Sequence, residues 1–418
     1  MPTVAYLTNQ FPTPVEPYVA QEILELRRCG VTVIPCSARH NPAPLDTALK
    51  IWATETLYLQ RLRLKLLIYA VLLCLIKFPL LKDFYARALW QGREPLERRL
   101  RAVVHTWLGV YYALLIEESG VEHIHVHHGY FASWIAMVAA RFLGIGFSLT
   151  LHGSDLLVHA AYLDTKLKHC MFCVTISEFN RRHILKYHPA IPQHKVIVRR
   201  MGVDPGLNKL SASQAGHQNR NLILLAVGRL HPVKDHVFLV RACRRLKDRG
   251  VPFECVIAGE GPERASIERL IRDLDLTAEV RLVGHLSRPQ LDLCYARADL
   301  VVLTSRSEGI PLVLMEAMAR GKTVLAPAIT GIPELVLDGK NGFLYCPGSL
   351  EDFVARVALF HDSRSAFGAF GQEARQHVLQ HFNRDKNLAA FCNFLLQQIT
   401  DAHRPNIKDH SYENSLLQ

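Results

Sequence analysis

The second half of the chain alternates short apolar runs with longer amphipathic runs, and this alternation constrains the fold more than any other feature. Strands are expected at 222–227, 254–258, 280–283, 300–303 and 323–326, with helices between them at 235–249, 265–274, 288–296 and 311–320. Strands and helices that alternate at this spacing are typical of a parallel sheet covered by helices on both faces. We therefore expect a doubly wound α/β domain over residues 220–386.

The first half repeats the pattern less regularly. A polar stretch at 206–219 (GLNKLSASQAGHQN) lacks any apolar period and separates the two halves. We expect a Rossmann-like domain over 1–205, this stretch as a linker and hinge, a last helix near 389–399 and a polar tail at 401–418. The elements expected within the first domain are strands at 4–8, 31–36, 123–126 and 147–151 and helices at 17–29 and 134–142.

Composition excludes several classes of protein. Hydrophobic residues make up 49% of the 418 residues, charged residues make up 21%, and the mean hydropathy is +0.08, which excludes a disordered, fibrous or collagen-like chain. The ten cysteines are scattered, and the single CxxC at 170–173 has no second pair at zinc-finger spacing. The first residues lack a basic segment followed by an apolar one. We expect a protein of the reducing cytoplasm.

The loop after the expected strand 300–303 favours an anion site. It reads Thr-Ser-Arg-Ser-Glu-Gly-Ile-Pro, so that Pro311 takes the first helical position and Gly321 ends the helix. Amide groups at such a helix start are free and lie at its positive end, which favours phosphate. Glu308 precedes the helix and Glu316 lies eight positions on. The two carboxylates are expected to contact different parts of one extended ligand, unless Glu308 only caps the helix and Glu316 faces solvent.

Two further loops follow the first two strands of this domain. In the loop 228–235 (GRLHPVKD), Arg229 and Lys234 are five positions apart across a turn. They can converge on a diphosphate, or they can be two solvated surface cations. The loop 258–262 (AGEGP) permits a close backbone approach but does not match GxGxxG, because Arg264 stands where the third glycine belongs.

The order of these loops resembles a known family. The runs VGRLHPVK, IAGEGPE, VRLVGHL, ADLVVLTSRSEGIPLVLMEAMARG and APAITGIPELVLDGKNGFL are similar to the nucleotide-sugar half of the GT-B glycosyltransferases of family 4. The resemblance is close over about 220–350 and loose elsewhere. It implies two Rossmann-like domains facing across a cleft, and a last helix (387–400) that packs back on the first domain. It also implies an activated sugar donor, retention of anomeric configuration and no obligatory metal.

The family's donor-site roles carry over onto the matching positions. By this resemblance, Arg229 and Lys234 hold the donor diphosphate. Glu308 binds the hydroxyls of the donor sugar, and Glu316 binds those of the ribose. His152, of an HG pair in the first domain, contacts the donor sugar. The distal phosphate is bound by the backbone of Gly309, Ile310, Pro311 and Leu312. The base is faced by the backbone of Gly284 and His285.

One position departs from the family pattern. Asp235 follows Lys234, where the family usually has glycine. An acid at this position would weaken diphosphate binding if it pointed inward, whereas an acid that caps the following helix would point away.

The N-terminal side resembles exopolysaccharide and capsule members of that family. The opening FPTPVEPYVAQEILELRRCG is similar to their FPxxSETFxxxEIxxLxxxG, but of SETF only Glu16 is kept. The candidate acceptor contacts are Glu16, His128 and Asp155. Histidines at 123, 125 and 127 would share one face of a strand and would suit a metal ion, but a hydrogen-bonded lining is the commoner arrangement and we expect no metal.

Residues 61–101 combine an apolar run with positive charge. The run 66–76 (LLIYAVLLCLI) has eleven apolar residues, fewer than the roughly 18–20 of a spanning helix. Ten Lys and Arg against three acids give the segment 61–101 a net charge of +7. Such a segment favours docking on an anionic membrane surface, unless the run is a buried helix. Nucleic acid is a less suitable partner, since no DNA- or RNA-binding motif is present.

The sequence therefore predicts a retaining glycosyltransferase at the cytoplasmic face of the membrane. Its donor would be a nucleotide-diphosphate sugar, with UDP-hexose favoured and GDP-mannose next, and its acceptor a lipid-linked or growing saccharide of a cell-surface polysaccharide. If configuration is inverted instead, a protein base is needed and Asp155 is the candidate. Two other classes stay open: a glycoside hydrolase using Glu308 and Glu316 as a carboxylate pair, and a non-catalytic nucleotide-sugar sensor or assembly protein.

Overall fold

The computed structural model describes residues 1–14, 16–41, 47–92, 94–158, 160–207, 221–364 and 366–403. Most of the expected linker 206–219 and of the expected tail 401–418 lies outside these residues. The chain divides into two units. The first comprises Met1–Leu149, Lys168–Met171 and the chain from Leu388 on, and the second comprises Thr150–Leu167 and Phe172–Asn387.

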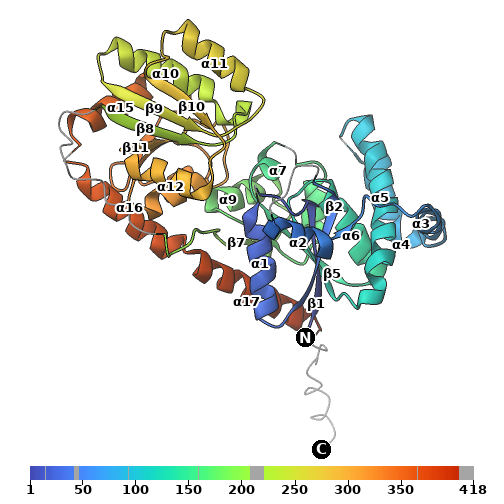
Figure 1. The fold of residues 1–418 in the computed structure, drawn as a ribbon. Coiled ribbons are helices and arrows are strands. Elements are labelled where there is room, and N and C mark those ends of the chain that lie inside the picture. Colours follow the sequence, from blue (N-terminus) through green and yellow to red (C-terminus); the bar gives the residue numbers. More distant parts are fainter. Residues whose placement is uncertain are drawn as a thin grey trace, which may run out of the picture. The chain divides into compact units, whose positions relative to one another are not determined.

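The N-terminal sheet has seven strands in the order β3-β2-β1-β4-β5-β6-β7 (Figure 1). β1 pairs in parallel with β2 and β4, and successive strands are added outward on both sides, which is the doubly wound arrangement. The four strands predicted in this half are confirmed as β1, β2, β4 and β5. The strands are β1 (Thr3–Gln10), β2 (Thr32–Arg39), β3 (Leu57–Tyr58), β4 (His123–His127), β5 (Gly146–Leu151), β6 (Cys173–Thr175) and β7 (Val196–Val198).

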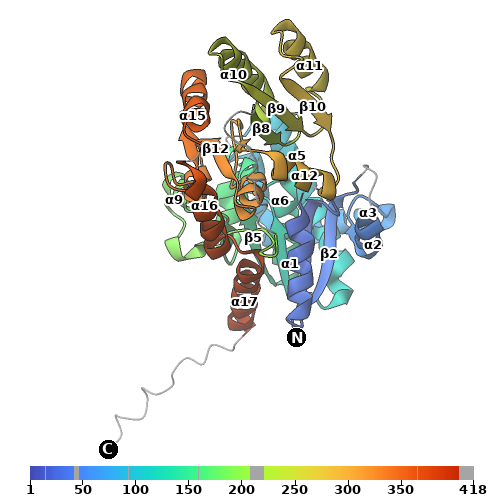
Figure 2. The same cartoon turned by 60° about the vertical axis from the view of Figure 1, so that its left-hand side comes forward.

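The second sheet has six parallel strands in the order β10-β9-β8-β11-β12-β13. Leu224 and Ala226 of β8 face one core cluster while Leu225 faces the other, because successive strand residues point to opposite faces. Both faces are therefore buried, and Figure 2 shows α10 and α11 beside β8 and β9. The strands are β8 (Leu222–Val227), β9 (Phe253–Ala258), β10 (Val280–Gly284), β11 (Leu300–Val302), β12 (Thr323–Pro327) and β13 (Phe343–Tyr345).

The predicted helices are present, and helices that were not predicted lie at 47–55, 64–116, 154–169, 178–187, 332–335 and 350–381. Those of the N-terminal half are α1 (Pro17–Arg28), α2 (Thr47–Glu55), α3 (Leu64–Ile76), α4 (Phe78–Leu89), α5 (Leu96–Ile116), α6 (Phe131–Leu143), α7 (Ser154–Leu157), α8 (Leu163–His169) and α9 (Glu178–Tyr187). Those of the C-terminal half are α10 (His236–Asp248), α11 (Arg264–Asp273), α12 (Arg288–Arg297), α13 (Leu312–Ala319), α14 (Ile332–Leu335), α15 (Leu350–Asp362), α16 (Gly368–His381) and α17 (Arg384–His403).

Helices α5 and α6 pack closely in the first unit. The Trp134 indole is buried and donates to the Thr106 hydroxyl at 3.0 Å, and Thr106 in turn donates to the Ala102 carbonyl. Gly109 lets the helices approach, because a Cβ placed there would lie 2.5 Å from the Cβ of Val138. This contact fixes α5 against the body of the unit.

Within the described residues, no single helix is both long and apolar enough to cross a membrane. The consecutive helices α3 and α4 reach the required length and composition only together, and they are bent by 93° where they join.

Close packing at Gly109 generates a stability prediction. Gly109→Ala should lower the thermal unfolding midpoint although alanine favours helices, because its methyl group overlaps Val138, and overpacking typically costs about 1–3 kcal/mol. Gly368→Ala is the control, since a Cβ at Gly368 meets no atom within 4 Å. Equal midpoints for the two variants in calorimetry would contradict the packing described for α5 and α6.

Candidate active site

The C-terminal half carries its chemically active side chains in the loops that follow its strands. Lys234 lies after β8, Glu308 after β11 and Thr330 after β12. The carboxyl ends of parallel strands lie at one edge of a sheet, which is where open α/β proteins bind ligands. The second unit thus gathers three loops that are far apart in sequence.

Lys234 and Glu308, both predicted donor-site residues, form an ion pair. The Lys234 ammonium donates to Glu308 Oε1, and the Ser305 hydroxyl donates to the same oxygen at 2.6 Å. The Thr330 hydroxyl donates to the Glu308 carbonyl at 2.6 Å. The two side chains are only 20% and 12% exposed. Glu308 is therefore fixed in position by three different loops.

The segment 309–312 presents free amides beside this pair. Within the described residues, the N–H groups of Gly309, Ile310 and Leu312 have no hydrogen-bond partner. α13 begins at Leu312, so Pro311 is its N-cap and the prediction that it takes the first helical position is wrong by one residue. The extended backbone of Pro311, at ψ 122°, cannot be helical. Three free donors at a helix start suit an anion, and the phosphate-binding role of this segment stays a prediction.

His152 lies close to this segment within the second unit. A Cβ on Gly309 would lie 2.5 Å from the His152 carbonyl oxygen, so only glycine fits there. Asp155 is fully buried, and its carboxylate accepts from the amides of His152 at 3.1 Å and Gly153 at 2.8 Å. Asp155 thus holds the turn that places the His152 backbone against Gly309.

Asp235, the departure from the family pattern, caps α10 and pairs with an arginine. Its carboxylate accepts from the Phe238 amide at 3.3 Å and pairs with the Arg306 guanidinium at 2.6 Å. Its φ of +49° lies in the left-handed region, where glycine would be unstrained. The cap and the ion pair offset this strain, which explains how an acid is accommodated beside the predicted diphosphate site.

Glu316 is held by two side chains of α12 and does not simply face solvent. Its carboxylate accepts from the Arg288 guanidinium at 2.8 Å and from the Tyr295 hydroxyl at 3.4 Å. Tyr295 is fully buried, and the pKa of its hydroxyl is raised well above the usual value by burial and by the Glu316 charge. Tyr295 therefore stays a hydrogen-bond donor, and the two partners hold Glu316 in a fixed direction.

The remaining predicted donor residues lie on the loops after β8 and β10. Arg229 is exposed, and it has no carboxylate partner among the described residues. Gly284 has a φ of +75°, and its carbonyl accepts from the Gly259 amide at 2.8 Å, while His285 is exposed. A Cβ on Gly259 would lie 1.9 Å from the Gly228 carbonyl oxygen. Gly259 therefore allows the loop 258–262 to approach the loop 228–235 closely.

Glu16 and His128, predicted from distant positions, contact each other in the first unit. His128 Nε2 lies 3.0 Å from Glu16 Oε1, and the His128 ring stacks on Tyr130. His128 has a φ of +71°, which is unusual for a residue with a side chain. Their assignment to an acceptor site stays a prediction.

The histidines of β4 are buried in a hydrogen-bonded network. His123 and His125 both contact the Ser148 hydroxyl, at 2.7 and 2.8 Å. His127 Nε2 lies 2.8 Å from Glu22 Oε2 and 2.8 Å from the Tyr6 hydroxyl. One ligand atom each from Glu22, His125 and His127 falls within 4.8 Å of the others, so this trio has the spacing of a metal site as well.

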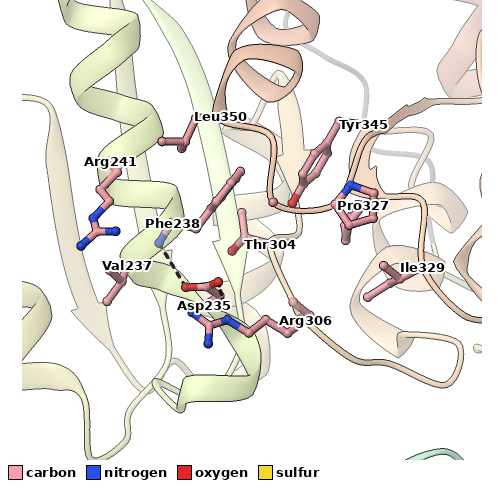
Figure 3. A pocket seen from close by; sticks show the side chains of 13 residues that line it. Asp235, Val237, Phe238, Arg241, Thr304, Arg306, Pro327, Ile329, Tyr345 and Leu350 are labelled. Carbon is pink, nitrogen blue, oxygen red and sulfur yellow. Dashed lines mark hydrogen bonds and ion pairs between the residues drawn. The ribbon is translucent and has the colours of Figure 1, made fainter.

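A pocket of about 480 Å³ lies where α10 begins and β12 and β13 end, and the Asp235–Arg306 ion pair lines it. Figure 3 shows Asp235 and Arg306 paired at one side of it and Phe238 and Tyr345 at the other. None of the predicted donor or acceptor residues lines it. Ser305 lines this pocket and also bonds to Glu308, so the pocket adjoins the site without being part of it.

Sequence reasoning missed the residues that position the predicted ones. Arg288 and Tyr295 hold Glu316, and Ser305 and Thr330 hold Glu308. Glu334 accepts from the amides that begin α9, those of Glu178 at 3.0 Å and Phe179 at 2.7 Å. The partners of Thr330 and Glu334 are set by tertiary structure, so the sequence does not reveal them.

The buried His236 generates a pH prediction. Burial lowers its pKa from the usual 6.5 to about 4, so below pH 6.5 the unfolded chain takes up a proton that the folded chain does not. The free energy of unfolding should therefore fall between pH 6.5 and 4. Urea titrations of the wild type and His236→Leu should show a shallower pH slope for the variant, whereas equal slopes would contradict a neutral buried imidazole.

The chain is similar to proteins of known family. Residues 209–377 match the family model described as Glycosyl transferases group 1. The chain is 33% identical over 203 residues to a putative colanic acid biosynthesis glycosyltransferase, WcaL, from Salmonella typhimurium. It is 34% identical over 199 residues to the amylovoran biosynthesis glycosyltransferase AmsK from Erwinia amylovora. Each match covers 46% of this chain, and 49% and 48% of these relatives, so the chain spans about half the length of the relatives it matches.

Solved structures share the fold. HepE from Anabaena, in complex with UDP and glucose, has a TM-score of 0.69 at 17% identity, over 95% of this chain and 100% of that one. Sucrose-phosphate synthase from Thermosynechococcus elongatus has a TM-score of 0.71 at 17% identity, over 96% of this chain and 100% of that one. The predicted GT-B class with two parallel-sheet α/β domains is confirmed. Residues 209–377 are therefore a glycosyl transferases group 1 domain, carried on a chain of GT-B fold.

Proposed function

We propose that the chain is a glycosyltransferase that transfers a sugar from a nucleotide-diphosphate donor to a saccharide in the synthesis of a cell-surface polysaccharide. The observation that carries this proposal is the convergence of Lys234, Glu308 and three free amides in the second unit. The names of WcaL and AmsK, as glycosyltransferases of colanic acid and amylovoran biosynthesis, and the UDP and glucose bound to HepE support it.

The proposed catalysis is electrostatic. Negative charge develops on the leaving diphosphate, and in this proposal Arg229, Lys234 and the free N–H groups of Gly309, Ile310 and Leu312 would stabilise it. Glu308 accepts hydrogen bonds and would orient the hydroxyls of the donor sugar. Glu316, held by Arg288, would bind the ribose hydroxyls. The chain's own cations supply the charge that the leaving group needs, so the proposed reaction has no obligatory metal.

Retention of anomeric configuration forms part of the proposal. Inversion needs a protein base, and the candidate Asp155 is fully buried, with its carboxylate accepting from two backbone amides. A base in that environment is poorly placed to reach an acceptor hydroxyl. We therefore favour proton transfer to an oxygen of the leaving donor phosphate on the same face of the sugar.

The donor and acceptor are proposed more finely as UDP-hexose, with GDP-mannose next, and a lipid-linked or growing saccharide. A lipid-linked acceptor requires the enzyme to work at a membrane, so we place the chain at its cytoplasmic face. The positive segment 61–101, with a net charge of +7, is the surface suited to that position.

The geometry disfavours a glycoside hydrolase. A hydrolase needs one protonated and one ionised carboxyl group facing the scissile bond. Glu308 contacts Lys234 and Ser305, whereas Glu316 contacts Arg288 and Tyr295, so the two carboxylates share no hydrogen-bond partner and are held by different groups of residues. If the chain were instead a non-catalytic sensor, it would bind nucleotide but transfer no sugar.

Removing the Lys234 charge should impair transfer. Lys234→Ala should lower the rate of nucleotide release from a nucleotide sugar by roughly 10²-fold, because a cation at the leaving group is lost. Lys247→Ala is the matched control, since Lys247 pairs with Asp275 and Glu279 on the surface of the same unit. An equal effect of the two substitutions would contradict the diphosphate role.

The isosteric substitution Glu308→Gln separates the enzyme from the sensor. It keeps the side chain's shape but removes its charge, so sugar transfer should be lost while the protein stays folded and still binds nucleoside diphosphate. Product sugar and circular dichroism are the measurements. Unchanged polysaccharide output in cells that carry only this variant would favour the non-catalytic assembly protein.

A further inference from the structure

Exposed apolar side chains are concentrated in one part of the first unit. Of the twenty large hydrophobic residues that are exposed among those described, twelve lie between Leu62 and Val104, about a tenth of the chain. They are Leu62 and Trp90, together with residues of α3, of the start of α4 and of the first half of α5. Figures 1 and 2 both show α3 at the periphery of the first unit. We call the exposed residues of 62–104 the outer helical surface.

α3 is apolar on the side that faces away from the protein. Leu64, Leu75 and Ile76 are 71%, 68% and 72% exposed, and Ile68 and Leu72 lie between them at helical spacing. Ala70 and Cys74, which are buried, lie on the opposite side of the helix. A soluble helix normally carries polar residues on its outer side, so this arrangement requires an apolar partner.

Positive charge surrounds the apolar residues. Lys65 lies within α3, Lys77 follows it and Lys82 lies on α4, and all three are exposed. Among the described residues no carboxylate pairs with any of them. Unpaired cations around an apolar face are what a surface needs to bind anionic headgroups and acyl chains together.

The surrounding packing excludes a spanning arrangement. α3 has 13 residues and is therefore about 20 Å long, less than the roughly 30 Å hydrocarbon thickness of a bilayer. α4 turns away by 93° and buries Leu81 and Phe84 in the protein, where Phe84 packs against Trp134. α4 is thus committed to the core of the unit, and α3 can only lie along the membrane surface.

We propose that the outer helical surface docks the chain on an anionic lipid bilayer, with α3 lying in the interface and its leucines and isoleucines entering the acyl region. The positive charge favours an anionic bilayer over a second copy of the chain, because two copies would bring like charges together. The benefit of docking rests on the proposed function, since an enzyme bound to the membrane would meet a lipid-linked acceptor. Binding to the bilayer does not depend on that function.

Vesicle co-sedimentation tests the proposal on the full chain. The wild type should bind vesicles that contain about 30% anionic phospholipid and should bind neutral phosphatidylcholine vesicles much more weakly. The triple variant Lys65→Gln, Lys77→Gln, Lys82→Gln should weaken anionic binding by about fivefold for each cation removed. The variant Ile68→Gln, Leu72→Gln, Leu75→Gln should lose binding to both kinds of vesicle.

The control and the readouts separate this proposal from the proposed function. Leu293→Gln, Leu359→Gln replaces exposed leucines of the second unit and should bind vesicles like the wild type. All variants should keep their unfolding midpoints and their UDP affinity. Wild-type protein that binds no anionic vesicles, or a triple variant that binds like the wild type, would overturn the docking surface. So would a concentration-dependent dimer that the Ile68, Leu72 and Leu75 substitutions dissolve. Vesicle binding without sugar transfer would instead count against the proposed function alone.

Discussion

The ion pair between Lys234 and Glu308 is the contact on which the proposed donor site depends. It joins the loop after β8 to the loop after β11, and Thr330 adds the loop after β12. A partly buried pair costs desolvation that its Coulomb attraction repays only with further hydrogen bonds, and Ser305 supplies one here. In a donor complex the diphosphate would compete for the lysine, leaving the carboxylate free to accept from sugar hydroxyls.

Charge around the site is unevenly neutralised. The acids Asp235 and Glu316 each have a guanidinium partner. Among the described residues, by contrast, Arg229 has no carboxylate partner, and no acceptor takes the N–H groups of Gly309, Ile310 and Leu312. Free backbone donors at the start of α13 favour an anionic ligand over a neutral sugar. Unpaired cations also lie on α3 and α4. There they accompany exposed apolar side chains, which suit lipid rather than a phosphate group alone.

Sequence alone predicted the second sheet well because five of its strands are short apolar runs ended by glycine, proline or a charged loop. β13 was missed, since Phe343–Tyr345 is too short to show a period. The loops that carry Lys234 and Glu308 were predicted, but Arg288, Ser305 and Tyr295 were not, because their partners are set by tertiary packing. Pattern reasoning also left open whether 66–76 is buried; α3 buries only Ala70 and Cys74.

The most direct test of the account is calorimetric titration of the wild-type protein with UDP and with GDP, each with and without a chelator. The account predicts tight binding of one nucleotide, UDP by preference, that survives chelation, because Arg229, Lys234 and the free amides supply the positive charge. Binding that requires a divalent metal, or no binding of either nucleotide, would contradict a donor site built from these residues.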